Sequence, residues 1–110
     1  MKYRVIIDPQ AKLDLREFFL YVVVNDSLEA ANKLLNNLEI TCHKLERYPE
    51  RGHIPEELRT TGVKKYLGIH YKPYRIIYEI NPNKVGMIYI HSVLDGRRNI
   101  QEILTGRILR

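Results

Sequence analysis

The pattern of apolar positions divides the chain into a helical first half and a β-rich second half. After a short β-prone run at residues 2–7, apolar residues recur with helical spacing through residues 9–24 and again from residue 28 to Tyr48. The two stripes are Ala11, Leu15, Phe18, Phe19 and Val22, and then Ala31, Leu34, Leu35, Leu38, Cys42 and Leu45. We therefore expect a strand followed by two amphipathic helices, although Tyr21 to Val24 is also β-prone.

Local signals mark the ends of both helices. Asp8 can cap the first helix, and Pro9 suits its first position because no N–H is needed there. The segment 25–27 breaks the pattern, and Asp26 with Glu29 resembles a capping arrangement. The second helix should end before Pro49, since the residue preceding a proline avoids the helical region. Helices joined by so short a turn should form an antiparallel hairpin.

Three β-rich runs follow a polar linker at residues 51–62. They span residues 63–70, 73–80 and 85–94, and a turn at 81–84 joins the last two. Pairing Ile80 with Val85 sets Arg75 opposite Ile90 and collects the more apolar residues on one face. That face, expected to take the helices, holds Tyr74, Ile76, Tyr78, Ile80, Val85, Met87, Tyr89, His91 and Val93.

Residues 99–104 read as a short closing helix after the turn at Asp95-Gly96. The sequence thus predicts one α+β domain over residues 1–110. It has an N-terminal strand, an antiparallel helical hairpin packed on one face of an antiparallel β-sheet, and a short C-terminal helix.

Positive charge is concentrated in the β-rich half. Residues 61–110 carry nine Lys/Arg against three Asp/Glu, whereas residues 1–60 carry nine against ten. A basic sheet on a neutral helical base indicates a polyanionic or acidic partner, whether RNA, DNA or an acidic protein segment. The single cysteine, Cys42, permits no intrachain disulfide. No signal peptide is visible and no apolar run approaches the ~20 residues that a bilayer requires. We expect a soluble cytoplasmic protein without a membrane partner.

Arg75 is the most informative candidate residue. It lies within an apolar strand, where a guanidinium is costly unless it faces water or an anionic partner. One interpretation is an arginine that projects from the face opposite the helices toward phosphate or carboxylate. The other is an exposed arginine paired with Glu79 on the same face.

Four further basic residues are candidates for binding a target or an inhibitor. Arg97 and Arg98 follow the last strand and can bracket a phosphate, or simply be solvated. Lys64 and Lys65 either extend the basic surface or lie one on each face of the sheet.

The histidines do not suggest a metal site, since His43, His53, His70 and His91 show no paired spacing. His91 is a possible general acid or base if exposed, but the expected register places it under the helices, where a buried, hydrogen-bonded role is favoured. Phosphate-binding loops, hydrolase elbows and carboxylate dyads are absent, and no cofactor is expected.

Several segments, in this order, resemble the RelE/ParE superfamily of toxins from type II toxin–antitoxin modules. They are the helix end Leu45–Gly52 (LERYPERG), Glu57–Arg59, the strand Tyr71–Tyr78 (YKPYRIIY) and Val93–Asn99 (VLDGRRN). The resemblance implies a helical hairpin on an antiparallel sheet whose opposite, concave face is the working surface. It also implies a cognate antitoxin, usually acidic, that blocks this surface.

The superfamily divides by target: RelE-like members cut mRNA on the ribosome, whereas ParE-like members inhibit DNA gyrase. Arg75 matches the strand arginine of RelE-like toxins, Arg98 matches the arginine after the last strand, and Lys64 and Lys65 correspond approximately to their lysines. No tyrosine follows Tyr89 to act as the C-terminal base of the nucleases, and Leu67-Gly68 replace an Arg-Glu pair of many ParE-like relatives.

Three hypotheses follow. Because arginine cannot serve as a base at neutral pH, a ParE-like gyrase inhibitor, not an enzyme, is favoured. The alternative is a metal-independent, ribosome-dependent endoribonuclease that uses Arg75 and Arg98, with His91 or an unrecognised residue as the base. The third is a non-toxic module that binds nucleic acid or the antitoxin.

Overall fold

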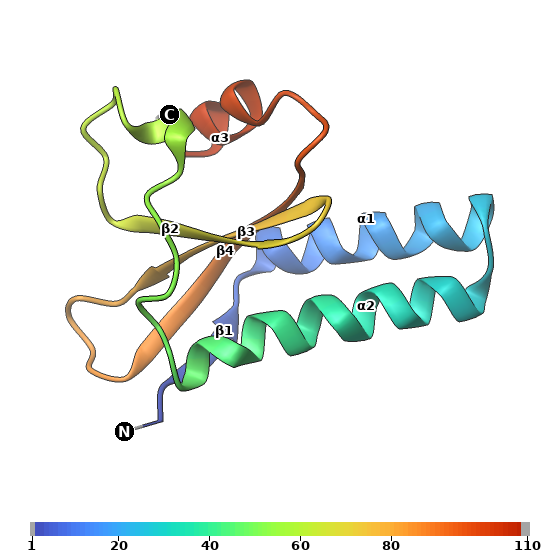
Figure 1. The fold of residues 1–110 in the computed structure, drawn as a ribbon, viewed down its shortest axis with the longest axis horizontal. Coiled ribbons are helices and arrows are strands. Elements are labelled where there is room, and N and C mark those ends of the chain that lie inside the picture. The colour runs from blue at the N-terminus through green and yellow to red at the C-terminus, as the bar shows by residue number, and fades with distance from the viewer. Residues whose placement is uncertain (1, 109–110) are drawn as a thin grey trace.

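A four-stranded sheet lies between two unequal helical layers in the computed structural model, which describes residues 2–108 (Figure 1). The strands β1 (Arg4–Ile7), β2 (Tyr66–Tyr71), β3 (Tyr74–Ile80) and β4 (Met87–Asp95) are arranged in the order β1-β4-β3-β2. The α+β fold class is confirmed, with one correction. β1 pairs in parallel with β4, so the sheet is mixed and not antiparallel throughout.

The helical hairpin of α1 (Pro9–Asn25) and α2 (Leu28–His43) covers one face of the sheet and extends beyond it (Figure 1). Its predicted apolar stripes form the main core with alternate strand residues. The fully or nearly buried members include Ala11, Leu15, Leu38, Cys42 and Leu45 from the helical segments, and Ile76, Tyr78, Ile88, Ile90 and Val93 from the sheet. Each large aliphatic side chain removed from water contributes about 1.5–3 kcal/mol, which is why the hairpin stays on this face.

The helix boundaries differ from the prediction in two places. Ser27, not Asp26, caps α2, because its Oγ accepts a hydrogen bond of 3.0 Å from the Ala30 N–H. α2 ends at His43 and continues as the 3₁₀ turn η1 (Lys44–Glu46), which buries Leu45. Asp8 occupies the N-cap position of α1 as expected, but its side chain makes no capping hydrogen bond.

The second face of the sheet is also covered. The 3₁₀ turn η2 (Glu56–Leu58) and α3 (Ile100–Ile108) pack there, and α3 runs past the predicted end at Leu104. A second apolar cluster results, consisting of Leu58, Tyr66, Ile77, Leu94, Ile100 and Leu104. The face that the sequence pattern left open is therefore a second buried layer.

The predicted register of β3 against β4 was wrong. Ile80 pairs with Ile88, and Val85 lies in a longer turn where it is 84% exposed. A β-bulge between Ile77 and Tyr78 then shifts the register, with His91 as the extra residue on β4. Arg75 consequently pairs with Leu94 instead of Ile90.

The bulge changes which residues of β4 face the hairpin. Ile88 and Ile90 face it before the bulge and Val93 faces it afterwards. The prediction that Met87 and Tyr89 face the hairpin was wrong. Side chains alternate along a strand, and the adjacent residues Ile88 and Ile90 face the hairpin. The prediction for Val93 was correct.

The linker after η1 is fixed by the Tyr78 hydroxyl. This hydroxyl donates to the Pro49 carbonyl at 2.7 Å and accepts from the Gly52 N–H at 3.0 Å. A Cβ atom at Gly52 would lie 2.7 Å from the Tyr78 oxygen and 2.8 Å from the Gly68 carbonyl, so only glycine fits. His53 then forms an antiparallel bridge with Gly68 of β2.

Replacing Tyr78 by phenylalanine should lower the free energy of unfolding by about 1–2 kcal/mol, since the partly buried Pro49 carbonyl and Gly52 N–H lose their partner. Urea denaturation followed by circular dichroism measures this change. Tyr21→Phe is the matched control, because Tyr21 is 68% exposed, and equal losses in both variants would contradict the assignment.

Candidate functional site

Arg75 lies on the face opposite the hairpin, as predicted, but it is not open to solvent. Its guanidinium contacts the Glu57 carboxylate through two hydrogen bonds of 2.6 and 2.9 Å, and its side chain is 17% exposed. Of the two predicted interpretations, the pair with Glu79 was wrong, since Glu79 instead lies 3.9 Å from Lys65. The carboxylate that pairs with Arg75 thus comes from η2 and not from its own strand.

The ion pair between Arg75 and Glu57 also changes the pKa of the Glu57 carboxyl group. The hydrogen bond from Arg75 is the main cause that holds the pKa of Glu57 below its usual range, while burial opposes this shift. A bidentate guanidinium–carboxylate pair fixes both geometry and charge. Arg75 therefore carries little free positive charge in this conformation.

Two shallow depressions flank this ion pair. The first, of about 390 Å³, is lined by Glu56, Glu57, Arg75, Gly96, Arg98, Asn99, Ile100 and Gln101. The second, of about 380 Å³, is lined by His53, Ile54, Pro55, Glu56, Glu57, Arg59, Gly68, His70 and Arg75. The predicted pair of Arg75 and Arg98 does share one surface, with Glu57 beside it.

The adjacent arginines after β4 behave differently. Arg97 is 70% exposed and donates from Nε and Nη2 to the Asp95 carboxylate at 2.9 and 2.8 Å. Arg98 is exposed and its side chain has no ion-pair partner among residues 2–108. Of the two, only Arg98 offers an unneutralised charge next to Arg75.

Lys64 and Lys65 do not join this surface. Both precede β2, which begins at Tyr66 and not at residue 63. β2 pairs Tyr66 with Glu79 and His70 with Arg75, so the lysines lie beyond the far end of the strand, roughly 17–20 Å along the chain direction from His70. Neither the predicted continuous basic surface nor one lysine on each face is found.

His91 faces the α3 side of the sheet, contrary to the prediction. Its ring meets the Tyr66 ring edge-on at 5.1 Å, and its Nδ1 lies 2.7 Å from the Ser92 Oγ. Burial lowers the pKa of His91, although the Asp8 carboxylate opposes this effect. His91 is half-buried, is hydrogen-bonded and lines neither depression beside Arg75.

Sequence reasoning missed two histidines that do lie beside Arg75. His70 is the cross-strand partner of Arg75, and His53 is brought alongside by its bridge to Gly68. Both are exposed and line the second depression. The correct β2–β3 pairing, which follows from the tight Lys72-Pro73 turn, would have identified His70.

A buried ion pair joining α1 to α3 was also missed. Asp14, with 5% of its side chain exposed, accepts two hydrogen bonds of 2.9 Å from Arg107 and another of 2.9 Å from the Val93 N–H. Arg107 also donates to the Ser92 Oγ at 3.0 Å. The sequence did contain a signal for this pair. Asp14 lies beside Leu15 on the apolar stripe of α1, where a carboxylate needs a buried partner.

Within residues 2–108, no group of three or more His, Cys, Asp or Glu side chains is placed to hold a metal ion. No helix in that range is both long and apolar enough to cross a membrane.

The family model for the ParE toxin of the type II toxin–antitoxin system parDE matches residues 5–100. The chain belongs to the ParE toxin family. A relative in Caulobacter vibrioides, Toxin ParE3, is 31% identical over 97 residues, which cover 88% of this chain and 90% of that toxin.

Two solved structures share the ParE fold seen here. The chromosomal ParDE toxin–antitoxin system from P. aeruginosa aligns with a TM-score of 0.66 at 17% identity, covering 84% of this chain and 94% of the other. The toxin–antitoxin complex RelBE2 from Mycobacterium tuberculosis aligns with a TM-score of 0.61 at 20% identity, covering 84% and 96%. At these identities the likeness concerns the fold.

Glu57 should make the stability of this ParE family member depend on acid pH. Because its folded pKa is depressed, its contribution is present above the ordinary pKa and is lost as the pH falls through the folded pKa. The wild-type protein should exceed Glu57→Gln in free energy of unfolding by about 1–2 kcal/mol at about pH 6, and this gap should close toward about pH 3.

Urea titrations at several pH values measure that gap. Glu56→Gln is the matched control because Glu56 is the exposed neighbour on η2. A gap that is constant with pH would show that the Glu57 carboxylate is not held by Arg75.

Asp14→Ala should cost about 3 kcal/mol of stability, since it leaves the Arg107 guanidinium and the Val93 N–H without their acceptor. Glu17→Ala, at an exposed position on α1, is the control and should change little. In a double-mutant cycle the added Arg107→Met should cost less than it does alone. Strictly additive losses would disprove the coupling of α1 to α3.

Proposed function

We propose that this ParE family toxin inhibits DNA gyrase in the cytoplasm and is neutralised by a cognate antitoxin. Family membership supports the toxin role and does not by itself name the target. The choice of gyrase rests on how the basic residues of the sheet are engaged.

The observation that carries the proposal is the bidentate Arg75–Glu57 pair. A nuclease of the RelE type needs a strand arginine free to stabilise charge on the scissile phosphate. Here the corresponding guanidinium is already neutralised by a carboxylate of the same chain. Arg97 is likewise held by Asp95, which leaves Arg98 as the unpaired arginine of the three.

The antitoxin partner is supported by two independent features. Both similar structures are named as toxin–antitoxin systems or complexes. The chain is also basic, with a net charge of +5, which favours an acidic partner. Exposed arginines such as Arg98 provide sites for carboxylates of that partner.

Purified toxin should abolish plasmid supercoiling by DNA gyrase at near-stoichiometric ratios, and preincubation with the product of the neighbouring antitoxin gene should restore it. Agarose gel electrophoresis of relaxed plasmid measures both effects. Arg75→Ala should retain inhibition in proportion to its folded fraction, because the proposal gives Arg75 a structural role.

Two outcomes would contradict this proposal. Untouched supercoiling together with cleaved mRNA in a translating extract would replace the gyrase target by the ribosome. Normal growth after inducing the toxin gene alone, with folded protein present, would instead indicate a non-toxic binding module.

The ribosome-dependent endoribonuclease is retained as a second candidate because His53 and His70 line the depression beside Arg75. An exposed imidazole can act as a general base near neutral pH, which the predicted His91 is not placed to do. In this mechanism Glu57 must release Arg75, so His70→Ala and Arg75→Ala should both abolish mRNA cleavage. Cleavage that survives both substitutions would reject the mechanism.

A further inference from the structure

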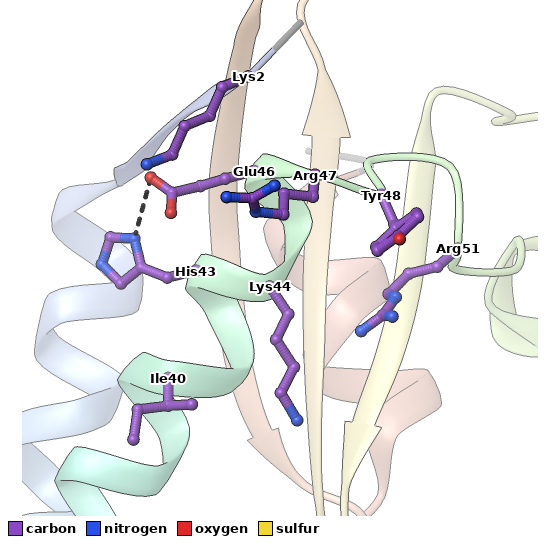
Figure 2. Close-up of a pocket in the computed structure, with 8 residues that line it drawn as sticks. All are labelled: Lys2, Ile40, His43, Lys44, Glu46, Arg47, Tyr48 and Arg51. Carbon is purple, nitrogen blue, oxygen red and sulfur yellow. Dashed lines mark ion pairs between the residues drawn. The ribbon is translucent and has the colours of Figure 1, made fainter.

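A basic depression at the base of α2 is separate from the surface around Arg75. It has a volume of about 350 Å³ and is lined by Lys2, Ile40, His43, Lys44, Glu46, Arg47, Tyr48 and Arg51 (Figure 2). It shares no lining residue with the two depressions beside Arg75. Three chain segments contribute to it, namely the start of the chain, the end of α2 with η1, and the linker.

Its positive charges are largely uncompensated. Lys2, Lys44 and Arg47 are exposed, and none has a carboxylate within ion-pair distance among residues 2–108. The one carboxylate lining the depression, Glu46, lies 3.7 Å from the His43 imidazole (Figure 2). A surface with more cations than carboxylates attracts an anionic ligand, and the long side chains of Lys and Arg adapt to its shape.

An exposed aromatic ring lies among these cations. Tyr48 is 62% exposed, and the Arg51 guanidinium is 5.5 Å from its ring centroid (Figure 2). A second depression, of about 520 Å³, shares Arg47, Tyr48 and Arg51, so the surface continues past the ring. An elongated ligand therefore has room on both sides of Tyr48.

We propose that this surface binds single-stranded nucleic acid, with phosphates on Lys44, Arg47 and Lys2 and a base stacked on Tyr48. Cationic grooves with exposed aromatic rings suit strands whose bases are unpaired. Duplex DNA keeps its base faces stacked inside and leaves Tyr48 without a ligand. An acidic peptide accounts for the cations but not for the exposed ring.

Fluorescence anisotropy of a labelled oligothymidylate of about 20 nucleotides tests the proposal on the full chain. The affinity should fall with salt, with a log–log slope of about −2 for three phosphate contacts. Lys44→Glu with Arg47→Glu should weaken binding at least tenfold. The control pair, Lys12→Glu with Lys33→Glu, reverses the charge of two exposed lysines on α1 and α2 that do not line the depression. It should leave the affinity within about twofold of the wild-type value.

Tyr48→Ala isolates the stacking contact. It should weaken the oligothymidylate complex at least about fivefold, and it should leave unchanged the weaker binding of an abasic strand of the same length. Circular dichroism confirms that each variant is folded, which is expected because Tyr48 is mostly exposed.

Three results would overturn the proposal. They are equal losses from the two charge-reversal pairs, equal affinity for abasic and base-bearing strands, and tighter binding of an oligoglutamate peptide than of the oligothymidylate. Because gyrase is not in the assay, none of these results bears on the proposed inhibition of that enzyme.

Discussion

The carboxylate of Asp14 is the contact on which the two-layered arrangement depends. It projects from α1 past the end of β1, where β4 would otherwise leave the Val93 N–H without a partner. Arg107 of α3 reaches the same oxygen atoms from the other side of the sheet. One buried carboxylate thereby joins the hairpin, the central strand and the second layer. Removing one partner of such an ion pair is strongly destabilising, because the other charge is left uncompensated.

The two layers determine how the arginines of the sheet are used. A toxin whose second face stayed bare would present Arg75 to its target directly. Here η2 brings Glu57 onto that face, and the guanidinium becomes part of the protein's own packing. Exposed positive charge lies instead at Arg98, at the periphery of the sheet, and around Lys44 and Arg47, at the base of α2.

Helical periodicity was enough to predict the hairpin, since Leu38 and its neighbours face one way only. The corresponding rule for strands, alternation of apolar and polar residues, failed for β4. Both faces of that strand are covered, so either Ile88 or Met87 could be placed toward the hairpin. The extra residue at the bulge carries no sequence signal of its own. Glu57 was unpredictable for another reason: it comes from an aperiodic linker, and only the folded chain brings it to Arg75.

The bridge between His53 and Gly68 has a consequence for the free protein. It occupies backbone groups on the outer side of β2, the strand at one margin of the sheet. An unpaired strand margin is a template on which other chains add and aggregate. By laying its own linker there, with Gly52 allowing the close approach, the polypeptide occupies the outer edge of β2 at Gly68 and blocks strand addition at that point.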